Sequence, residues 1–425
     1  METKRGLIVG TAFAGLVVAA PASAITRDEI AKRYAPVFHQ EVRDKARDLY
    51  AAYDFDGNWA GDDNEENLTC IAEPNKCAPA SPCAAGKCGL VGTVYFTVIE
   101  TGTHWFVQYM PYHPRDTKVT NGHEHDTESV LAVIAKDGPE GKLLAIETRF
   151  HSEWFVYADA SVKAGAKSPH GSIHVDAQGR PQIYSQQVGH GLCGGFSPPN
   201  NVFPDLQLTC NHGEAPHISA TGVVYRPDLP PAQPIVVDGK AVDAGYAMVE
   251  MLTSFWARRT EVGPGKTFKA LIDFTGERCG VLPCPKQFGG AFMGDGGESP
   301  SGPWNQEAGA GVKGNGSQFF DPAYTMKKRL TFAEPYSLHY CHNPYVGIDD
   351  KCPAVPPETP GSSGGPASNP TTPGETSPPP VSSSEPSTPP SEEESGCTIT
   401  RARSSSWAWL PIVLFGVLVL LRRRQ

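Results

Sequence analysis

The chain is predicted to form a mainly β domain, an elaborated β-sandwich with few short helices and with loops held by disulfides. Short runs of β-branched and aromatic residues, separated by Gly, Pro and Asp, follow one another through the middle of the chain. Helix-length patterns are confined to two places. The 11 cysteines leave an even set once one C-terminal cysteine is set aside, which suits an oxidising compartment.

The expected elements follow in chain order. Thr26 to Glu29 forms a capping-box pattern, which predicts a short helix that ends before Pro36. A second helical pattern covers residues 246–258, and the dense Gly and Pro after Gln287 predict long surface loops rather than another core. Strands are expected at residues 93–99, 105–110, 129–135, 142–150, 154–157, 182–185, 222–225 and 268–274.

Both ends of the chain differ in composition from the middle. Residues 1–24 form a secretory signal peptide, since a basic start and an apolar run lead to a small-residue cleavage site at Ala24. The mature ectodomain is expected at 25–352. Residues 353–396 are rich in Pro, Ser, Thr and Glu, which predicts a disordered stalk. An apolar segment at 407–421, followed by an Arg tail, predicts a membrane span with the ectodomain outside.

The last residues resemble a known sorting signal. Ser395-Gly396-Cys397, a basic spacer, the apolar segment and the Arg tail look like the MYXO-CTERM signal of myxobacterial surface proteins, here at residues 397–425. The resemblance implies that a membrane-embedded sorting protease processes Cys397 and that the product is displayed at the cell surface.

Ten cysteines remain for disulfides. Local pairing is plausible for Cys193 with Cys210, Cys279 with Cys284, and Cys341 with Cys352. The connectivity of the first four cannot be read from their spacing. A zinc site in that group is the weaker alternative, because no paired CxxC motif is present.

Charge and motif content exclude several classes of function. The formal net charge of −10 at pH 7 argues against nucleic acid as a partner. Neither a GxxxxGK(S/T) phosphate-binding loop nor a GxGxxG fingerprint that opens a helix is visible in the sequence, so a nucleotide is not expected either. Gly-x-Ser-x-Gly is also absent from the expected ectodomain, and no Ser-His-Asp order can be assigned.

One acidic and histidine-rich stretch is the best candidate site. Alternate residues of a strand share a face, so Asp126 and Glu128 point to one side, about 7 Å apart. A divalent cation would relieve their repulsion, and His123 can also reach it, in a cluster that begins upstream with Asp116. The oxygen majority favours Ca²⁺ or Mg²⁺, while Mn²⁺ or Zn²⁺ is possible. The alternative is a solvated polar turn leading into a strand.

The stretch from Gln108 to Glu128, with its Gly-His-Glu-His-Asp-Thr-Glu motif, resembles the necrosis-inducing protein family, or Nep-like cytolysins, and proteins similar to a vacuolar-sorting-associated protein. Further matches extend the resemblance over residues 34–190, within a family-like core at about 34–230. The further matching stretches are 34–38, 54–59, 169–171 and 183–191.

The resemblance implies a β-sandwich that carries a divalent cation in a cleft. Its ligands would be Asp116, His123, Asp126 and Glu128, and family histidines near the cleft match His170 and His190. In cytolytic members of the family the metal helps to bind the sugar headgroup of a membrane lipid. The chain departs from the family motif in having Glu124 in place of Arg and Thr127 in place of Trp, which is expected to make the site more acidic.

A second acidic pattern, from Asp54 to Glu65, matches several EF-hand ligand positions. Trp59 stands where the sharp turn needs Gly, so a structural loop or a looser calcium site is favoured over a true EF-hand.

Three functions remain open. The first is a surface-displayed module whose metal cleft binds a glycan or a lipid headgroup, possibly as a cytolysin. The second is a metal-dependent hydrolase with His170 or His190 as a weak candidate for proton transfer. The third is a structural surface protein without catalytic activity.

Overall fold

The computed structural model describes residues 25–352, apart from gaps at 118–121, 152, 197–209, 219–220, 274–281, 283–286, 295–300, 307–315 and 334. The expected signal peptide, stalk and sorting signal, including Cys397 and the segment 407–421, lie outside the described residues. Among the residues that are described, no helix combines the length and apolar character needed to cross a membrane.

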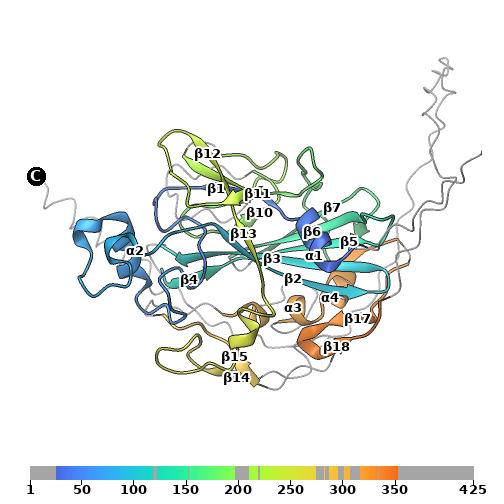
Figure 1. Ribbon diagram of the computed structural model, residues 1–425. Coiled ribbons are helices and arrows are strands. Elements are labelled where there is room, and N and C mark those ends of the chain that lie inside the picture. The colour runs from blue at the N-terminus through green and yellow to red at the C-terminus, as the bar shows by residue number, and fades with distance from the viewer. Residues whose placement is uncertain are drawn as a thin grey trace, which may run out of the picture. The chain divides into compact units, whose positions relative to one another are not determined.

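A nine-stranded sheet forms the centre of the described chain (Figure 1). Its main path runs β18-β17-β2-β3-β5-β6-β7, with β13 added beside β2 and β4 beside β3. The fold class predicted from the sequence is confirmed. The strands of this sheet are β2 (Thr93–Thr101), β3 (His104–Arg115), β4 (Glu124–Thr127), β5 (Val130–Ala135), β6 (Lys142–Phe150), β7 (Glu153–Ala158), β13 (Ala247–Glu250), β17 (Tyr340–Asn343) and β18 (Ile348–Asp349).

A five-stranded sheet covers one face of the large sheet, above it in Figure 1. In its order β10-β9-β1-β11-β12, β1 pairs in parallel with β9 and antiparallel with β11. Aromatic side chains fill the space between the sheets: Tyr50 stacks on Tyr225 with ring centroids 4.3 Å apart, and Phe38 packs on its edge. The strands of this sheet are β1 (Val37–Glu41), β9 (Gln182–Ser185), β10 (Leu192–Cys193), β11 (Gly222–Pro231) and β12 (Ala241–Gly245).

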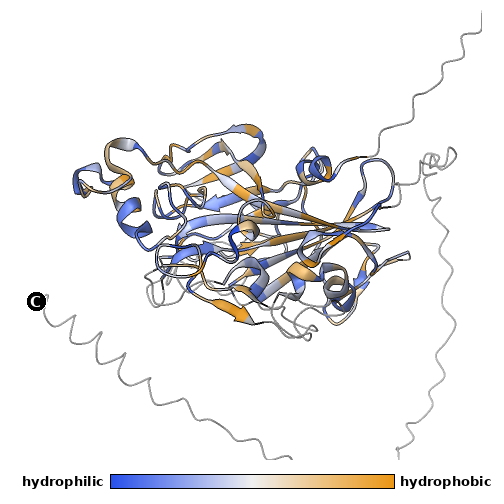
Figure 2. Cartoon of the chain, turned by 60° about the horizontal axis from the view of Figure 1, so that its bottom comes forward, coloured by the Kyte–Doolittle hydropathy of each residue, from blue (hydrophilic) through white to orange (hydrophobic). Residues whose placement is uncertain are grey.

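Short elements complete the fold. Helix α1 begins where the sequence predicts, because Thr26 and Glu29 form a capping box in both directions. Figure 2 shows orange, hydrophobic stretches along the strands of the large sheet. The remaining elements are α1 (Arg27–Arg33), α2 (Asn64–Ala72), α3 (Ser317–Phe320), α4 (Pro322–Arg329), the 3₁₀ turns η1 (Pro74–Lys76), η2 (Ala84–Gly86), η4 (Trp256–Arg258), η6 (Pro303–Asn305) and η7 (Pro344–Val346), and the strand pairs β14 (Leu271–Asp273) with β15 (Gln287–Gly289) and β8 (Lys163–Ala164) with β16 (Leu330–Thr331).

The helix predicted at residues 246–258 is wrong. The segment begins as strand β13 and ends in the 3₁₀ turn η4. Backbone N–H groups of Ala247 and Met251 donate to carbonyl groups of Gly92 and Phe96. Pairing with the edge of β2 therefore satisfies the backbone and overrides the local helical periodicity.

The prediction of surface loops after Gln287 is also wrong for the described part of that region. Phe288, Phe292 and Trp304 are buried and pack against one another and against Phe268. Glycine permits this packing, since a Cβ atom at Gly302 would lie 3.0 Å from the Trp304 ring. Strands β14 and β15, together with α3 and α4, lie on the second side of the large sheet, below it in Figure 1.

Four disulfides are present among the described residues. Two of them, Cys193–Cys210 and Cys341–Cys352, are local pairs that the spacing suggests. The other two resolve the first four cysteines as Cys70–Cys77 and Cys83–Cys88. The suggested pair of Cys279 with Cys284 lies outside the described residues.

Candidate functional site

The site is built on the hairpin of β3 and β4. The two strands pair antiparallel, with His113 opposite Asp126 and Arg115 opposite Glu124. Side chains directly opposite each other share a face of the sheet, so the imidazole of His113 and the carboxylate of Asp126 lie together. Both residues are buried.

His190 links Asp126 to a second buried acid. Nδ1 of His190 hydrogen-bonds to Oδ2 of Asp126 at 2.8 Å, and its Nε2 hydrogen-bonds to Oδ1 of Asp48 at 3.1 Å. Asp48 also accepts the backbone N–H groups of Arg43, Asp44 and Val188. The carboxylates of Asp48 and Asp126 therefore hold the ring between them.

This arrangement fixes the charge of His190. Burial alone would lower its pKa, but the hydrogen bonds and negative charges of Asp126 and Asp48 outweigh burial and raise the pKa to about 10. Burial would raise the pKa of Asp126, yet the hydrogen bond and charge of His190 hold it well below its ordinary value. At neutral pH the group is an imidazolium between two carboxylates.

His113 lies against this group in its neutral form. Its ring stacks on that of His190 with centroids 3.6 Å apart and planes 7° apart. Burial, followed by the charge of His190, keeps the pKa of His113 well below the ordinary value. Its Nε2 hydrogen-bonds to Oε1 of Gln40 at 3.1 Å.

The other predicted ligands lie around the hairpin. Asp116 donates its backbone N–H to the carbonyl of His123 at 2.8 Å, and Oδ2 of Asp116 lies 4.0 Å from Nε2 of His123. The charge of His123 acts on Asp126. Glu128 instead contacts residues of the turn after β6 and of β6 itself. Its Oε1 accepts the backbone N–H of His151, and its Oε2 lies 3.6 Å from Nε of Arg149.

Glu124 does not make the site more acidic, contrary to the expectation from the sequence. Its Oε1 lies 3.3 Å from Nη1 of Arg115, which compensates its charge. His125 belongs to the opposite face, where it stacks on Tyr53 and hydrogen-bonds to Tyr112. A Cβ atom at Gly61 would overlap the His125 ring, so glycine there lets the loop before α2 close on this histidine.

Backbone strain is concentrated in the segments that form the site. Among the described residues, five non-glycine positions have positive φ, and four of them belong to these segments. Such conformations cost about 1–3 kcal/mol each and persist where the surroundings impose them, which is common at functional sites. The four positions are His125 (56°), His151 (56°), Val188 (70°) and His190 (54°).

The EF-hand-like pattern is a structural loop. Asp56 accepts hydrogen bonds from Asn58 and Asn67 and so closes its own turn. Glu65 pairs with Arg47 and Arg115. The side chains of both acids are thus used within the fold.

His170 and His190 occupy different surroundings. Nδ1 of His170 accepts the backbone N–H of Val156 on β7, and its ring lies 5.0 Å from that of His212. Burial and Lys167 lower the pKa of His170. Of the two histidines that the family resemblance selects, His190 is the one in contact with Asp126.

Two members of a clustered donor set can serve a cation. One ligand atom from each of His113, Asp126 and His190 lies within 4.8 Å of the other two, but both ring nitrogens of the charged His190 are used by Asp126 and Asp48, which leaves His113 and Asp126 as donors. His190 binds Oδ2 of Asp126, so Oδ1 is the oxygen that can bind an ion. Among the described residues, Nδ1 of His113 is a buried atom with no hydrogen-bond partner.

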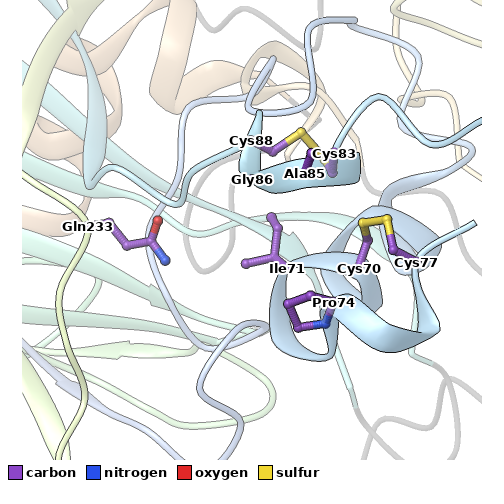
Figure 3. Close-up of a pocket in the computed structure, with 9 residues that line it drawn as sticks. All are labelled: Cys70, Ile71, Pro74, Cys77, Cys83, Ala85, Gly86, Cys88 and Gln233. Atoms are coloured by element: carbon purple, nitrogen blue, oxygen red, sulfur yellow. A yellow bond between two sulfur atoms is a disulfide. The ribbon is translucent and has the colours of Figure 1, made fainter. Parts of the chain in front are cut away.

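A separate pocket of about 190 Å³ lies beside α2 (Figure 3). Two disulfides, Cys70–Cys77 and Cys83–Cys88, form much of its wall, together with Ile71, Pro74 and the amide of Gln233. None of its lining side chains titrates, so the acidic and histidine-rich group on β3 and β4 remains the candidate for ligand chemistry.

Sequence reasoning missed three residues of this group: His113, Asp48 and Gln40. His113 had a readable signal, because continuing the predicted strand at 105–110 into a hairpin with the motif places it opposite Asp126. Asp48 and Gln40 are positioned by β1 and the turn after it, through parallel pairing with the distant strand β9. A contact of that range leaves no local signal in the sequence.

Neither a protein-family model nor a curated protein matches the chain. Solved structures of necrosis-inducing toxin folds do match. A structure described as "Toxin fold for microbial attack and plant defense" is 18% identical, covers 47% of this chain and 75% of that chain, and has a TM-score of 0.25. At TM-scores near this value the likeness supports no conclusion about function.

Two further structures match to a similar extent. Necrosis and Ethylene inducing Protein 2, from the causal agent of cocoa's Witches Broom disease, is 17% identical, with 46% and 76% of the two chains covered and a TM-score of 0.25. NLPPya in complex with glucosamine is 19% identical, with 44% and 69% covered and a TM-score of 0.23.

Proposed function

We propose that this chain is an exported, non-enzymatic binding module that holds one divalent cation at the β3–β4 hairpin and uses it to bind a sugar headgroup of a cell-surface glycan or lipid. The observation that supports this most directly is Asp126. Its carboxylate is buried and ionised, one of its oxygens is fixed by His190, and the other oxygen can bind an ion beside His113.

The residues around Asp126 would share the ion. The sequence motif supplies Asp116, His123 and Glu128 as further candidates, and a bound cation would supply the positive charge that attracts hydroxyl or phosphate oxygens of a headgroup. His190 and Asp48 keep Asp126 oriented, as hydrogen-bonded partners of metal ligands do.

Export agrees with the four disulfides among the described residues, which require an oxidising environment. The C-terminal signal would then display the module at the cell surface, with Cys397 as the residue processed by a sorting protease. The TM-scores of the toxin-fold structures leave the cytolytic activity of the family as an expectation only.

Metal content is the first test. The full chain should contain about one equivalent of a divalent ion by elemental analysis, and the double variant Asp126→Asn, Glu128→Gln should contain none. The matched control Glu153→Gln, Asp159→Asn changes two acids near β7 and should keep the ion. Equal metal content in the wild type and the site variant would contradict the proposal.

Ligand binding is the second test. The wild-type chain should bind glycan arrays or glycolipid vesicles, and a chelator should abolish the signal. If the chelator lowers only the melting temperature and no glycan or vesicle binds, the cation has a structural role and the binding function is wrong.

A further inference from the structure

The tautomer of His113 is set by Gln40. Nε2 of Gln40 donates to the carbonyl oxygens of Glu41 and Gln186, at 2.6 Å and 3.2 Å. Its Oε1 therefore faces the other way, where it accepts Oγ–H of Ser185 at 2.5 Å and meets Nε2 of His113 at 3.1 Å. Since this oxygen only accepts, His113 carries its proton on Nε2, and Nδ1 is an unprotonated lone pair.

That lone pair is buried. His113 is 1% exposed, and among the described residues nothing hydrogen-bonds to its Nδ1. Leaving a buried acceptor unsatisfied costs stability, whereas a nitrogen held ready for a metal would be satisfied when the metal binds. The Gln40 contact satisfies the ring N–H and leaves the other nitrogen, Nδ1, as the unsatisfied atom of the ring.

Asp126 is oriented in a parallel way. Nδ1 of His190 holds its Oδ2, and Asp48 in turn holds Nε2 of His190. A chain of two partners thus stands behind each of two ligand atoms: Ser185 and Gln40 behind His113, and Asp48 and His190 behind Asp126. Partners of this kind fix the orientation of metal ligands in proteins.

We propose that His113 binds the cation through Nδ1, together with Asp126, and that this nitrogen makes the site selective for Zn²⁺ or a similar ion rather than for Ca²⁺ or Mg²⁺. Imidazole suits zinc-class ions, whereas Ca²⁺ and Mg²⁺ take oxygen ligands. This inference rests on the proposed function, because it specifies which ion the same site holds. It replaces the preference for Ca²⁺ or Mg²⁺ that the oxygen-rich motif suggests.

The test compares two buried histidines of one strand. Metal-stripped full chain, His113→Gln and His104→Gln would be titrated with Zn²⁺, with Co²⁺ as a spectroscopic probe, and with Ca²⁺ and Mg²⁺. His104 is 2% exposed and lies at the other end of β3, about 30 Å away. We expect His113→Gln to lose at least about 100-fold in Zn²⁺ affinity, the upper end of what a lost partner of a ligand costs. His104→Gln should bind as the wild type does.

The outcomes separate the inference from the proposed function. If the wild type prefers Ca²⁺ or Mg²⁺, or if His113→Gln keeps full Zn²⁺ affinity, His113 is not a ligand, while a metal site at Asp126 stands. If the wild type binds none of these ions, both fail.

A second measurement does not depend on how the variant folds. In the ¹⁵N-histidine-labelled wild-type chain, Zn²⁺ should shift Nδ1 of one histidine from the unprotonated to the metal-bound range. Saturation with Zn²⁺ that leaves every unprotonated Nδ1 signal in place would overturn the assignment.

Discussion

The two faces of the large sheet bury charge in different ways. On the face towards the small sheet, Asp126 binds His190, which binds Asp48. On the face under the C-terminal helices, Glu147 of β6 forms an ion pair with Arg329 of α4, and both side chains are fully buried. Each face thus places a carboxylate against a cation in the interior.

What differs is the kind of atom that each group leaves without a hydrogen bond. Gln318 donates to Oε1 of Glu147 at 2.6 Å, and the Arg329 guanidinium lies 5.3 Å from the ring centre of Trp154. Among the described residues, Oε2 of Glu147 and the guanidinium nitrogens of Arg329 also lack hydrogen-bond partners, but these atoms carry opposite charges and form an ion pair with each other. Nδ1 of His113 has neither a hydrogen-bond partner nor an opposite charge of its own. A buried charge by itself therefore does not mark a binding site, and an unpaired donor atom beside it is the stronger sign.

The largest effect is expected from breaking the ion pair of Glu147 and Arg329. Arg329→Met should lower the free energy of unfolding by about 3–5 kcal/mol, because it leaves Glu147 buried without a countercharge. Adding Glu147→Leu to the same chain should recover most of that loss, since a well-packed apolar pair replaces a buried ion pair at little cost. Denaturant unfolding of the two variants and the wild type measures both differences.

An exposed ion pair, Lys142 with Asp159, serves as the control. Nζ of Lys142 lies 3.3 Å from Oδ1 of Asp159, with 46% of the lysine side chain accessible. Lys142→Met should change the free energy of unfolding by less than about 1 kcal/mol. If Arg329→Met lowers the free energy of unfolding by no more than Lys142→Met does, Glu147 does not need its partner. The two faces would then not differ as described.

Sequence patterns predicted the two faces unequally. Runs of β-branched and aromatic residues at 105–110 and 129–135 placed the strands, and alternation within the motif selected Asp126. No local sequence pattern indicates that Arg329 is buried. It stands in the basic last turn of α4 with Lys327 and Lys328, a pattern typical of a solvated helix end. Its burial follows from packing across the sheet, as does the arrival of Asp48 at His190, and neither contact is local in sequence.

A smaller effect is expected from a substitution in the group of Asp48, His190 and Asp126. Asp48→Asn should lower the free energy of unfolding by about 2 kcal/mol, since it removes a buried charged hydrogen-bond partner of His190. The same variant should bind the cation about 10- to 100-fold more weakly, because Asp126 loses its fixed orientation. Unfolding and metal titration of one preparation test both. Loss of stability with unchanged affinity would show that Asp48 does not act on Asp126 through His190.

The smallest effect concerns a histidine on the C-terminal face. His104 packs against Tyr336 and Phe332, and its Nδ1 meets Oγ1 of Thr103 at 2.8 Å, a hydroxyl where His190 has carboxylates. Burial, then the charges of Lys136 and Lys327, lower the pKa of His104 to about 4. Its folded pKa lies below the unfolded value of about 6.5, so the unfolded chain binds the proton more readily, and stability falls as the pH drops from about 6.5 towards 4.

This histidine should account for about 1 kcal/mol of the stability lost by pH 5.5. In His104→Gln that share of the pH dependence should disappear, which unfolding curves at pH 7.5 and 5.5 would measure. The exposed His339 serves as the control, and His339→Gln should leave the difference between the two pH values unchanged. An undiminished pH dependence in His104→Gln would mean that His104 takes up a proton in the folded chain as easily as in the unfolded one. The neutral histidine on this face would then not contrast with the charged one at Asp126.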